Sequence, residues 1–320
     1  MKKLYLRLLG FLALVLLASC ATPYKNYPKL KTFDELVYPF DMKKQQLSQN
    51  VVMAYAEVGS GLQTLIFVHG LGSYAPAWKK NVEDLKDQYR CLVVDLPGYG
   101  KSSKGAYESS MEFYANYLVE WMDSIGLSSA IVVGHSMGGQ IAMVMALTHP
   151  QRVNALVLAA PAGFETFDEG QKQWFREVLS PKSVALTPAS GIQSNLTYNF
   201  NVFPEDANFM ISDRLAMRHM EGFDAYCYVV VNCVKGMVNR PVYDYLHQIK
   251  QPTLVVFGEY DMLIPNRWLN PGFTQTIAKD GVSKIPNARL LMLPKAGHFV
   301  QWEAANLVNR EIKLFVDNLQ

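Results

Sequence analysis

Cysteine, charge imbalance and repetition are scarce in this sequence. It has four cysteines in 320 residues and a formal net charge of only +2. The first 19 residues hold three of the 30 basic residues and no acid, so the remainder has a balance of 27 − 28 = −1. No spacing of cysteine and histidine matches a zinc site, and there is no internal repeat or low-complexity tract. We therefore expect no metal, no cofactor and no nucleic-acid partner.

Apolar residues, by contrast, are plentiful. The sequence is 50% hydrophobic and 18% charged, which is typical of a globular protein. A chain of this length can form one large hydrophobic core, or a core with a small subdomain.

The N-terminus has the pattern of a targeting segment. Lys2, Lys3 and Arg7 form a basic region, and residues 8–18 form an apolar run that is too short to span a membrane comfortably. The run ends in Leu-Ala-Ser-Cys at residues 17–20, which resembles the lipobox of bacterial lipoproteins. The resemblance implies a signal peptide over residues 1–19, lipidation of Cys20, and an exported protein anchored to a bacterial membrane, periplasmic or surface-facing. An ordinary signal peptide with a chance cysteine and an uncleaved anchor remain alternatives.

The three other cysteines are expected to be free thiols. Cys91 opens an apolar strand and is expected to be buried. Cys227 and Cys233 are six residues apart in a predicted helix, which separates them by about 9 Å, too far for a disulfide.

Alternating apolar strands and helices fill most of residues 50–320. The predicted strands are residues 51–58, 65–68, 91–94, 131–133, 153–159, 252–257 and 289–293. Wholly apolar strands joined by helices predict an α/β fold, with a mostly parallel central sheet covered by helices on both faces. We expect this domain to span residues 50–320 and to be preceded by a tether over residues 20–49.

The alternation stops in the middle of the domain. Residues 163–247 are rich in aromatic residues and methionine and show no strand–helix repeat. This segment is predicted to be an inserted α-helical cap.

A serine between two glycines lies where a predicted strand meets a predicted helix. The strand stops at Gly134, the helix includes residues 141–147, and Gly134-x-Ser136-x-Gly138 joins them. Glycine lets the helix pass close to the strand and tolerates a strained turn. This is the context of a nucleophile elbow, which raises the serine hydroxyl above the sheet at the start of a helix.

Five motifs follow predicted strands in a fixed order. They are His69-Gly70, Asp95-x-x-Gly98-x-Gly100-x-Ser102, the Ser136 elbow, Gly258-x-x-Asp261 and Gly297-His298. In these motifs the chain resembles the α/β-hydrolase family over residues 50–320. Glu303 stands where the family often has an acid, and Ala305 departs from the proline that usually follows it.

The resemblance implies a serine hydrolase. Ser136 would be the nucleophile, His298 the base that takes its proton, and Asp261 the carboxylate that orients His298. The backbone N–H groups of Leu71 and Met137 would form the oxyanion hole.

The remaining histidines are expected to have no part in the chemistry. His69 is predicted to order its loop by hydrogen bonding, and His135 is the variable residue of the elbow. His219 lies in the predicted cap, where it could touch a substrate.

The favoured function is hydrolysis of carboxylic esters, on a small-molecule substrate with an apolar portion that the apolar cap would accept. A C–C bond hydrolase of ring-cleavage products is an alternative, because such enzymes resemble this chain in Ser-Met-Gly-Gly and in the cap. They usually have tryptophan after the catalytic histidine, where this chain has Phe299. A non-catalytic ligand-binding module on a lipid anchor is a second alternative. Peptidase, amidase and metal-free perhydrolase activities also remain open.

Overall fold

An eight-stranded sheet forms the centre of the protein. The structure is a computed structural model, and it describes residues 27–319. The strand order is β1-β2-β4-β3-β5-β6-β7-β8; β2 is antiparallel to both β1 and β4, and all other pairs are parallel. The strands are β1 (Met42–Gln46), β2 (Val52–Val58), β3 (Thr64–Val68), β4 (Arg90–Asp95), β5 (Ala130–His135), β6 (Val153–Ala159), β7 (Thr253–Gly258) and β8 (Ala288–Leu293).

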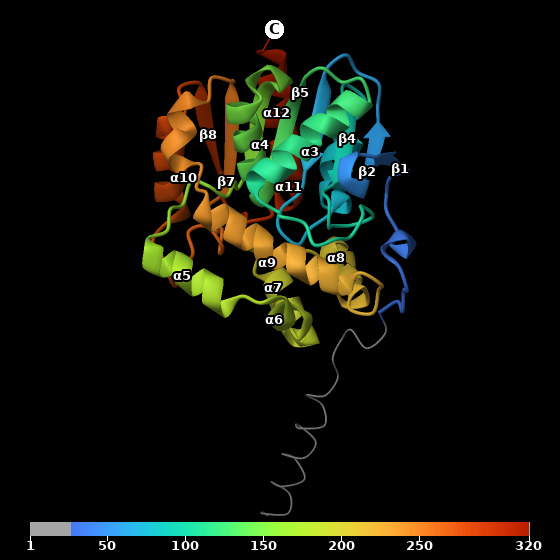
Figure 1. Ribbon diagram of the computed structural model, residues 1–320. Helices are drawn as coiled ribbons and strands as arrows, with labels where there is room; N and C mark the ends of the chain where they lie inside the picture. The colour runs from blue at the N-terminus through green and yellow to red at the C-terminus, as the bar shows by residue number, and fades with distance from the viewer. Residues whose placement is uncertain (1–26, 320) are drawn as a thin grey trace, which may run out of the picture.

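Helices cover both faces of the sheet, which confirms the predicted α/β fold (Figure 1). On one face lie α3 (Met111–Ser124), α4 (Met137–Thr148) and α10 (Thr274–Lys284). On the other lie α2 (Lys79–Leu85), α11 (Val300–Glu303) and α12 (Ala305–Asp317). Short 3-10 helices are η1 (Phe33–Glu35), η2 (Ser48–Asn50), η3 (Ala75–Trp78), η4 (Pro150–Arg152), η5 (Glu205–Ala207) and η6 (Tyr243–Gln248). None of the helices within residues 27–319 is long and apolar enough to cross a membrane.

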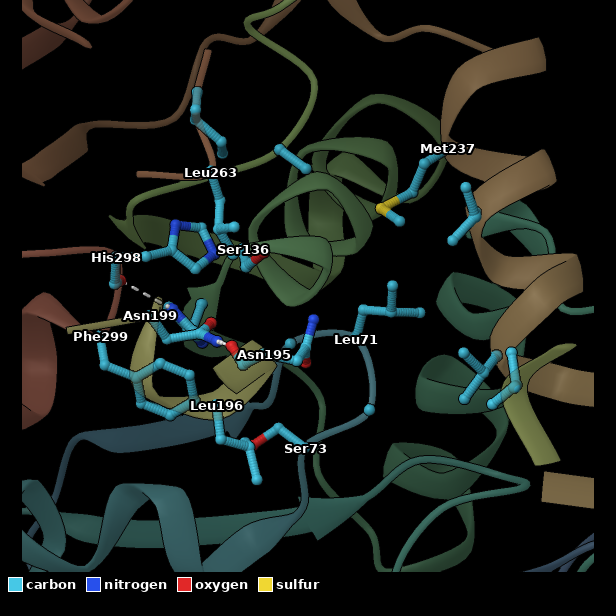
Figure 2. Close-up of a pocket in the computed structure, with 18 of the residues that line it drawn as sticks. Leu71, Ser73, Ser136, Asn195, Leu196, Asn199, Met237, Leu263, His298 and Phe299 are labelled. Atoms are coloured by element: carbon cyan, nitrogen blue, oxygen red, sulfur yellow. Dashed lines mark hydrogen bonds between the residues drawn. The ribbon is translucent and has the colours of Figure 1, made fainter. Parts of the chain in front are cut away.

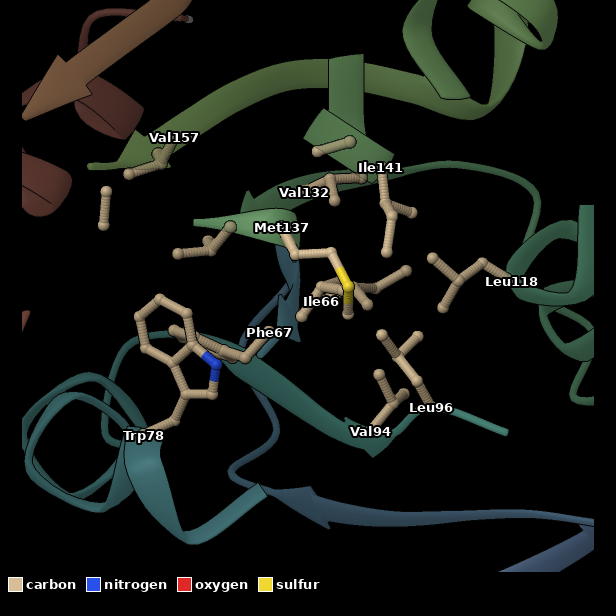
Figure 3. Close-up of a cluster of buried hydrophobic side chains, with 14 of the residues drawn as sticks. Ile66, Phe67, Trp78, Val94, Leu96, Leu118, Val132, Met137, Ile141 and Val157 are labelled. Carbon is tan, nitrogen blue, oxygen red and sulfur yellow. The ribbon is translucent and has the colours of Figure 1, made fainter. Parts of the chain in front are cut away.

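The core lies between the sheet and these helices. All six residues of β5 and all six of β7 are buried, as expected for strands covered on both faces. Figure 3 shows the side chain of Met137 among Ile66, Val132 and Ile141, below the elbow. Met137 therefore fixes the start of α4 in the core, while its backbone remains at the edge of the sheet.

A helical segment separates β6 from β7. It contains α5 (Glu169–Val178), α6 (Pro181–Ala185), α7 (Ala189–Thr197), α8 (Asn208–Met217) and α9 (Phe223–Asn239). We call residues 169–239 the cap. Figure 1 shows the cap across the end of the sheet at which the parallel strands terminate, with the long helix α9 packed against α3, α5 and α6.

The expected tether over residues 20–49 is wrong for the part that the structure describes. β1 pairs with β2, from Met42 opposite Ala56 to Gln46 opposite Val52. Phe33 is buried in the main core. β1 is a polar edge strand, so it has no apolar alternation that would identify it in the sequence. The predicted signal peptide and Cys20 lie outside the described residues.

The free thiols predicted from helical spacing are confirmed. Cys91, Cys227 and Cys233 are all unpaired and buried. Burial raises the pKa of Cys91 to about 12 and the pKa of both Cys227 and Cys233 to about 11.

Candidate active site

Ser136 lies in a strained turn between β5 and α4. Its backbone has φ 53° and ψ −118°, a conformation that residues with side chains rarely adopt. Two close approaches hold the turn: a Cβ on Gly134 would lie 2.3 Å from the carbonyl oxygen of Gly138, and one on Gly138 would lie 2.3 Å from that of Val68. Ser136 also donates its N–H to the Ala159 carbonyl, at 3.0 Å, across to β6. The elbow geometry therefore requires glycine on both sides of the serine.

Asp261 and His298 follow the neighbouring parallel strands β7 and β8, and they meet beyond the sheet edge. His298 Nδ1 lies 2.8 Å from Asp261 Oδ2. The other carboxylate oxygen accepts hydrogen bonds from the N–H groups of Leu263, at 2.8 Å, and Ile264, at 3.0 Å. Both side chains are buried. Because the carboxylate accepts from Nδ1–H, Nε2 of the imidazole is left without its proton and can act as a base.

Ser136 and His298 line one cavity between the sheet and the cap. Its volume is about 550 Å³. Figure 2 shows both residues at the cavity wall, together with Leu71 from the loop after β3. The structure thus brings the three sequence-predicted triad residues into one place, although Ser136 Oγ makes no direct hydrogen bond to His298 among the described residues.

Two backbone amides, one next to Ser136 and one in the loop after β3, are unpaired among residues 27–319. In the part of the chain that the structure describes, the N–H groups of Leu71 and Met137 have no hydrogen-bond partner. Met137 is the first residue of α4, where backbone N–H groups are unpaired by the helix itself and the helix dipole favours negative charge. The arrangement suits the predicted oxyanion hole, which itself remains a prediction.

Buried polar side chains fix the loop that carries Leu71. His69 Nδ1 donates to the Gly70 carbonyl at 2.8 Å, and its Nε2 accepts from the Leu96 N–H at 3.1 Å. Burial lowers the pKa of His69, which keeps the ring neutral and able to make both bonds. The expectation that His69 orders the loop is confirmed.

The Asp95 motif likewise supports the loops instead of facing the cavity. Asp95 Oδ1 accepts from the Ala75 N–H at 2.7 Å, and Oδ2 accepts from Tyr38 Oη at 2.9 Å and from the Lys101 N–H at 2.8 Å. A Cβ on Gly100 would lie 2.1 Å from Asp95 Oδ2, so this glycine leaves room for the carboxylate.

Glu303 joins the His298 loop to the cap. Its Oε2 accepts from the Gly297 N–H at 2.6 Å, directly before His298. Its Oε1 accepts from the N–H groups of Asn201 and Val202, each at 3.0 Å, in the segment between α7 and α8. One carboxylate therefore fixes both the loop that carries His298 and the adjoining part of the cap.

His135 is a site residue that the sequence did not identify. The ring is buried, its Nε2 lies 3.0 Å from the His298 carbonyl oxygen, and its centroid lies 4.9 Å from that of the His298 ring. Since a carbonyl only accepts, Nε2 carries the proton. Burial, and then the neighbouring His298, lower the pKa of His135 well below its usual value, so the ring stays neutral. A variable elbow position gives no sequence signal for this support of His298.

The cavity wall is mostly apolar, with two charged side chains. Glu165 Oε1 accepts from the Asn266 N–H and from Asn270 Nδ2, both at 2.8 Å, and burial raises the pKa of Glu165. Arg214 donates to the Gly72 carbonyl and stacks on Tyr226, 5.2 Å from the ring centroid. The apolar wall is formed by Leu71, Phe167, Phe175, Val184, Ile192, Leu196, Met210, Met217, Phe223, Val230, Val234, Met237, Val238, Leu263, Ile264 and Phe299.

His219 does not line this cavity. It lies on the surface, where its Nε2 is 3.0 Å from Tyr27 Oη. The suggestion that His219 touches substrate is therefore wrong. Within residues 27–319, no cluster of three histidine, cysteine or acidic side chains is placed to hold a metal ion.

Comparison with known proteins identifies the family. The model of the alpha/beta hydrolase fold matches residues 63–305. A 2-hydroxy-6-oxononadienedioate/2-hydroxy-6-oxononatrienedioate hydrolase of Cupriavidus pinatubonensis is 30% identical over 283 residues, which cover 82% of this chain and 89% of the relative. The dihydrolipoyllysine-residue acetyltransferase component of the acetoin cleaving system of Cupriavidus necator is 29% identical over 81% of this chain, and the chain spans only 65% of that relative.

Solved structures agree on the fold. An esterase from Exiguobacterium antarcticum superposes with a TM-score of 0.71 at 21% identity, over 86% of this chain and 99% of the esterase. The matched family model and the relative that is 30% identical show that the chain is a hydrolase and belongs to the alpha/beta hydrolase fold family.

Proposed function

We propose that the protein hydrolyses carboxylic esters with an apolar portion, through an acyl-enzyme on Ser136. The observation that carries the proposal is the buried hydrogen bond between Asp261 and His298 beside Ser136 in one apolar cavity. Serine is a weak nucleophile without an adjacent base, and an imidazole with a free Nε2 at this edge supplies one.

The reaction then proceeds in two halves. Ser136 Oγ bonds to the ester carbonyl carbon while His298 Nε2 takes the serine proton. The oxyanion receives hydrogen bonds from the N–H groups of Leu71 and Met137; removing one such donor costs about 10²–10³-fold in kcat. The alkoxy C–O bond breaks, and His298 gives its proton to the departing alcohol.

Water completes the second half. It attacks the acyl carbon while His298 takes one of its protons, and that proton returns to Ser136 Oγ as the acid leaves. Asp261 keeps the imidazole in its orientation and stabilises the imidazolium in both halves.

A fluorophosphonate probe tests the nucleophile. The full chain and its Ser136→Ala variant are labelled, and both are assayed with p-nitrophenyl esters of increasing acyl length. We expect labelling that vanishes in Ser136→Ala and an activity optimum at an intermediate length. A folded sample that takes no label would favour the non-catalytic binding module.

C–C bond hydrolysis is the second candidate. It is favoured by the relative named for 2-hydroxy-6-oxononadienedioate hydrolysis and by Arg214 at the cavity wall, since a guanidinium pairs well with a substrate carboxylate. Phe299 in place of the usual tryptophan argues against it. A synthetic 2-hydroxy-6-oxo-dienoate, followed by the loss of its visible absorbance, is the test. If this candidate were correct, the turnover rate on this compound would exceed the turnover rate on the best ester.

We also propose that Cys20 carries the lipid that attaches the protein to a bacterial membrane. The support is the sequence alone, with an apolar run that ends in Leu-Ala-Ser-Cys. Cells fed a labelled fatty acid should label the wild-type protein and leave Cys20→Ala unlabelled, and the variant should leave the membrane fraction. Equal behaviour of the two proteins would refute the anchor.

A further inference from the structure

Two of the five tryptophans are exposed, and each lies one or two residues along the chain from a residue that lines the cavity. Trp268 is 93% exposed in the loop between β7 and α10, and Trp174 is 45% exposed on α5, whereas the other three tryptophans are buried. The two segments are in contact, because Gln171 Nε2 of α5 donates to the Leu269 carbonyl at 2.8 Å. Trp174 follows Gln171 by three residues and so lies on the neighbouring part of the same helix.

Further exposed apolar residues continue along the cap. Val178 stands at the end of α5 and Leu186 directly after α6, both exposed. We call Trp174, Val178, Leu186 and Trp268 the outer cap surface. Figure 1 shows α5 and α6 at the end of the molecule remote from the sheet. Exposed apolar surface at one end of a molecule is typical of a contact with a protein or a membrane.

The described chain begins on this same end of the molecule. Tyr27 stacks on His219, with ring centroids 5.9 Å apart, and packs against a buried cluster of cap residues from α7 and α8. Cys20 precedes Tyr27 by seven residues, a length that reaches at most about 25 Å. A lipid on Cys20 would therefore hold the cap, and not the far end of the sheet, next to the bilayer.

We propose that the outer cap surface docks on the lipid bilayer, with Trp174 and Trp268 inserted at the head-group level. The proposal rests on the lipid anchor at Cys20. Tryptophan favours this interface because its ring is apolar and its N–H is polar. Lys182 and Glu177 are both exposed on α6 and α5, so the surface carries charges of both signs and docking should depend little on anionic lipid.

An aromatic row links the outer cap surface to the cavity. The Trp174 ring centroid is 5.2 Å from that of Phe175, and Phe175 is 5.1 Å from Phe167. Phe175 and Phe167 both line the cavity that holds Ser136. Docking would therefore bring the apolar wall of the cavity close to the bilayer, so that the acyl chain of a lipid-dissolved ester can enter with little exposure to water.

Tryptophan fluorescence tests the docking directly. The full chain is reconstituted in phosphatidylcholine vesicles whose lipids carry bromine either near the head group or near the chain end. We expect the head-group-proximal bromine to quench a large part of the emission, and quenching to disappear in Trp174→Phe/Trp268→Phe, where only the buried tryptophans remain. Aqueous iodide should quench the wild type less in vesicles than in detergent.

A matched probe on the opposite end controls for nonspecific contact. Leu62 is fully exposed in the turn before β3, at the sheet end away from the cap. Leu62→Trp in the double-phenylalanine background should be quenched by iodide and not by brominated lipid. Quenching of wild type equal to that of the Leu62→Trp probe would overturn the proposal. So would tryptophans that neither bromine nor iodide reaches, because a second copy of the chain would then cover the surface.

Activity gives a second readout. Trp268→Ser should lose several-fold in rate on an ester dissolved in vesicles and keep the wild-type rate on a short water-soluble ester, whereas Leu62→Ser should change neither. Equal rates for the two variants on the vesicle-borne ester would overturn the proposal. Fatty-acid labelling of Cys20 and fluorophosphonate labelling of Ser136 report separately on the anchor and on the nucleophile, so a failure of either is distinguished from a failure of docking.

Discussion

The sheet edge and the cap enclose the same cavity by different means. At the sheet edge, Ser136, Asp261 and His298 follow wholly buried strands or lie in buried turns, and backbone contacts and buried hydrogen bonds fix them. In the cap, α5 has no buried residue and contributes partly buried side chains such as Phe175. The positions of the three predicted triad residues thus depend on backbone geometry, whereas the shape of the cavity depends on side chains that can be exchanged at lower cost.

The largest difference between the two regions is expected at Asp261. Asp261→Asn should lower kcat by about 10⁴-fold with little change in KM, because the amide no longer fixes the His298 tautomer. The matched control is Asp87→Asn, at an exposed carboxylate two residues after the end of α2, which should keep wild-type kcat. A single substitution in the cap that lowered kcat as much would contradict this difference between the sheet edge and the cap.

Replacing a glycine should affect the stability of the protein more at the sheet edge than in the cap. Gly134→Ala places a Cβ 2.3 Å from the Gly138 carbonyl oxygen, and we expect it to lower the free energy of unfolding by about 3 kcal/mol or more. In Gly170→Ala, in α5, the new Cβ would contact only the Asp168 side chain, at 3.3 Å. This variant should raise the free energy of unfolding by up to about 1 kcal/mol. Urea unfolding of both variants measures this, and losses of similar size would contradict the distinction.

Glu303 connects the two regions, so its replacement should affect both. Glu303→Gln keeps the size of the side chain but removes the charge that accepts from the Gly297, Asn201 and Val202 N–H groups. We expect kcat to fall about tenfold, which corresponds to roughly 1.4 kcal/mol, and the melting temperature to fall with it. A fall in melting temperature with unchanged kcat would show that Glu303 stabilises the cap without positioning His298.

Within the cap, a cavity residue should change specificity and leave the chemistry intact. Met237 extends from α9 into the cavity (Figure 2). Met237→Trp should reduce kcat/KM for long acyl esters several-fold and spare short ones, since one methylene is worth about 1–3 kcal/mol in a fitted pocket. Fluorophosphonate labelling should keep its wild-type rate; slower labelling would mean that the cap affects the nucleophile as well.

The smallest effect concerns pH. Burial lowers the pKa of His135 in the folded state, so below about pH 6.5 the unfolded chain binds a proton that the folded chain does not, and stability falls as the pH falls. His135→Gln keeps an N–H donor for the His298 carbonyl and should weaken this acid dependence. His69 has the same direction of shift, so part of the dependence should remain. The urea unfolding midpoints of wild type and His135→Gln, measured between about pH 7.5 and about pH 5, test this prediction. If the midpoints of the two proteins fell equally with pH, the prediction would be wrong.

Much of the sheet and its edge could be predicted from the sequence because local rules act there. Apolar strands bounded by glycine identified the elbow around Ser136, and the motifs at the strand ends placed Asp261 and His298 together. Each signal reflects a backbone requirement, such as the missing side chain at Gly134.

The parts that escaped prediction depend on long-range packing. β1 is polar and gains its order from pairing with β2, so its sequence resembles a linker. The role of His135 depends on the His298 carbonyl, 163 residues away, and the partner of His219 is Tyr27, 192 residues away. No local spacing reports such contacts.

The three buried thiols give the protein a practical chemical property. Maleimides and iodoacetamides react with thiolates, and a thiol with a pKa of about 11 is ionised to less than about one part in a thousand near neutral pH. Cys91, Cys227 and Cys233 should therefore stay silent toward such reagents while the chain is folded. In a Cys20→Ala background, a cysteine introduced on the Trp268 loop could then carry a spin label or a dye. The three buried thiols would become reactive only on unfolding, which makes them a built-in reporter of the folded fraction.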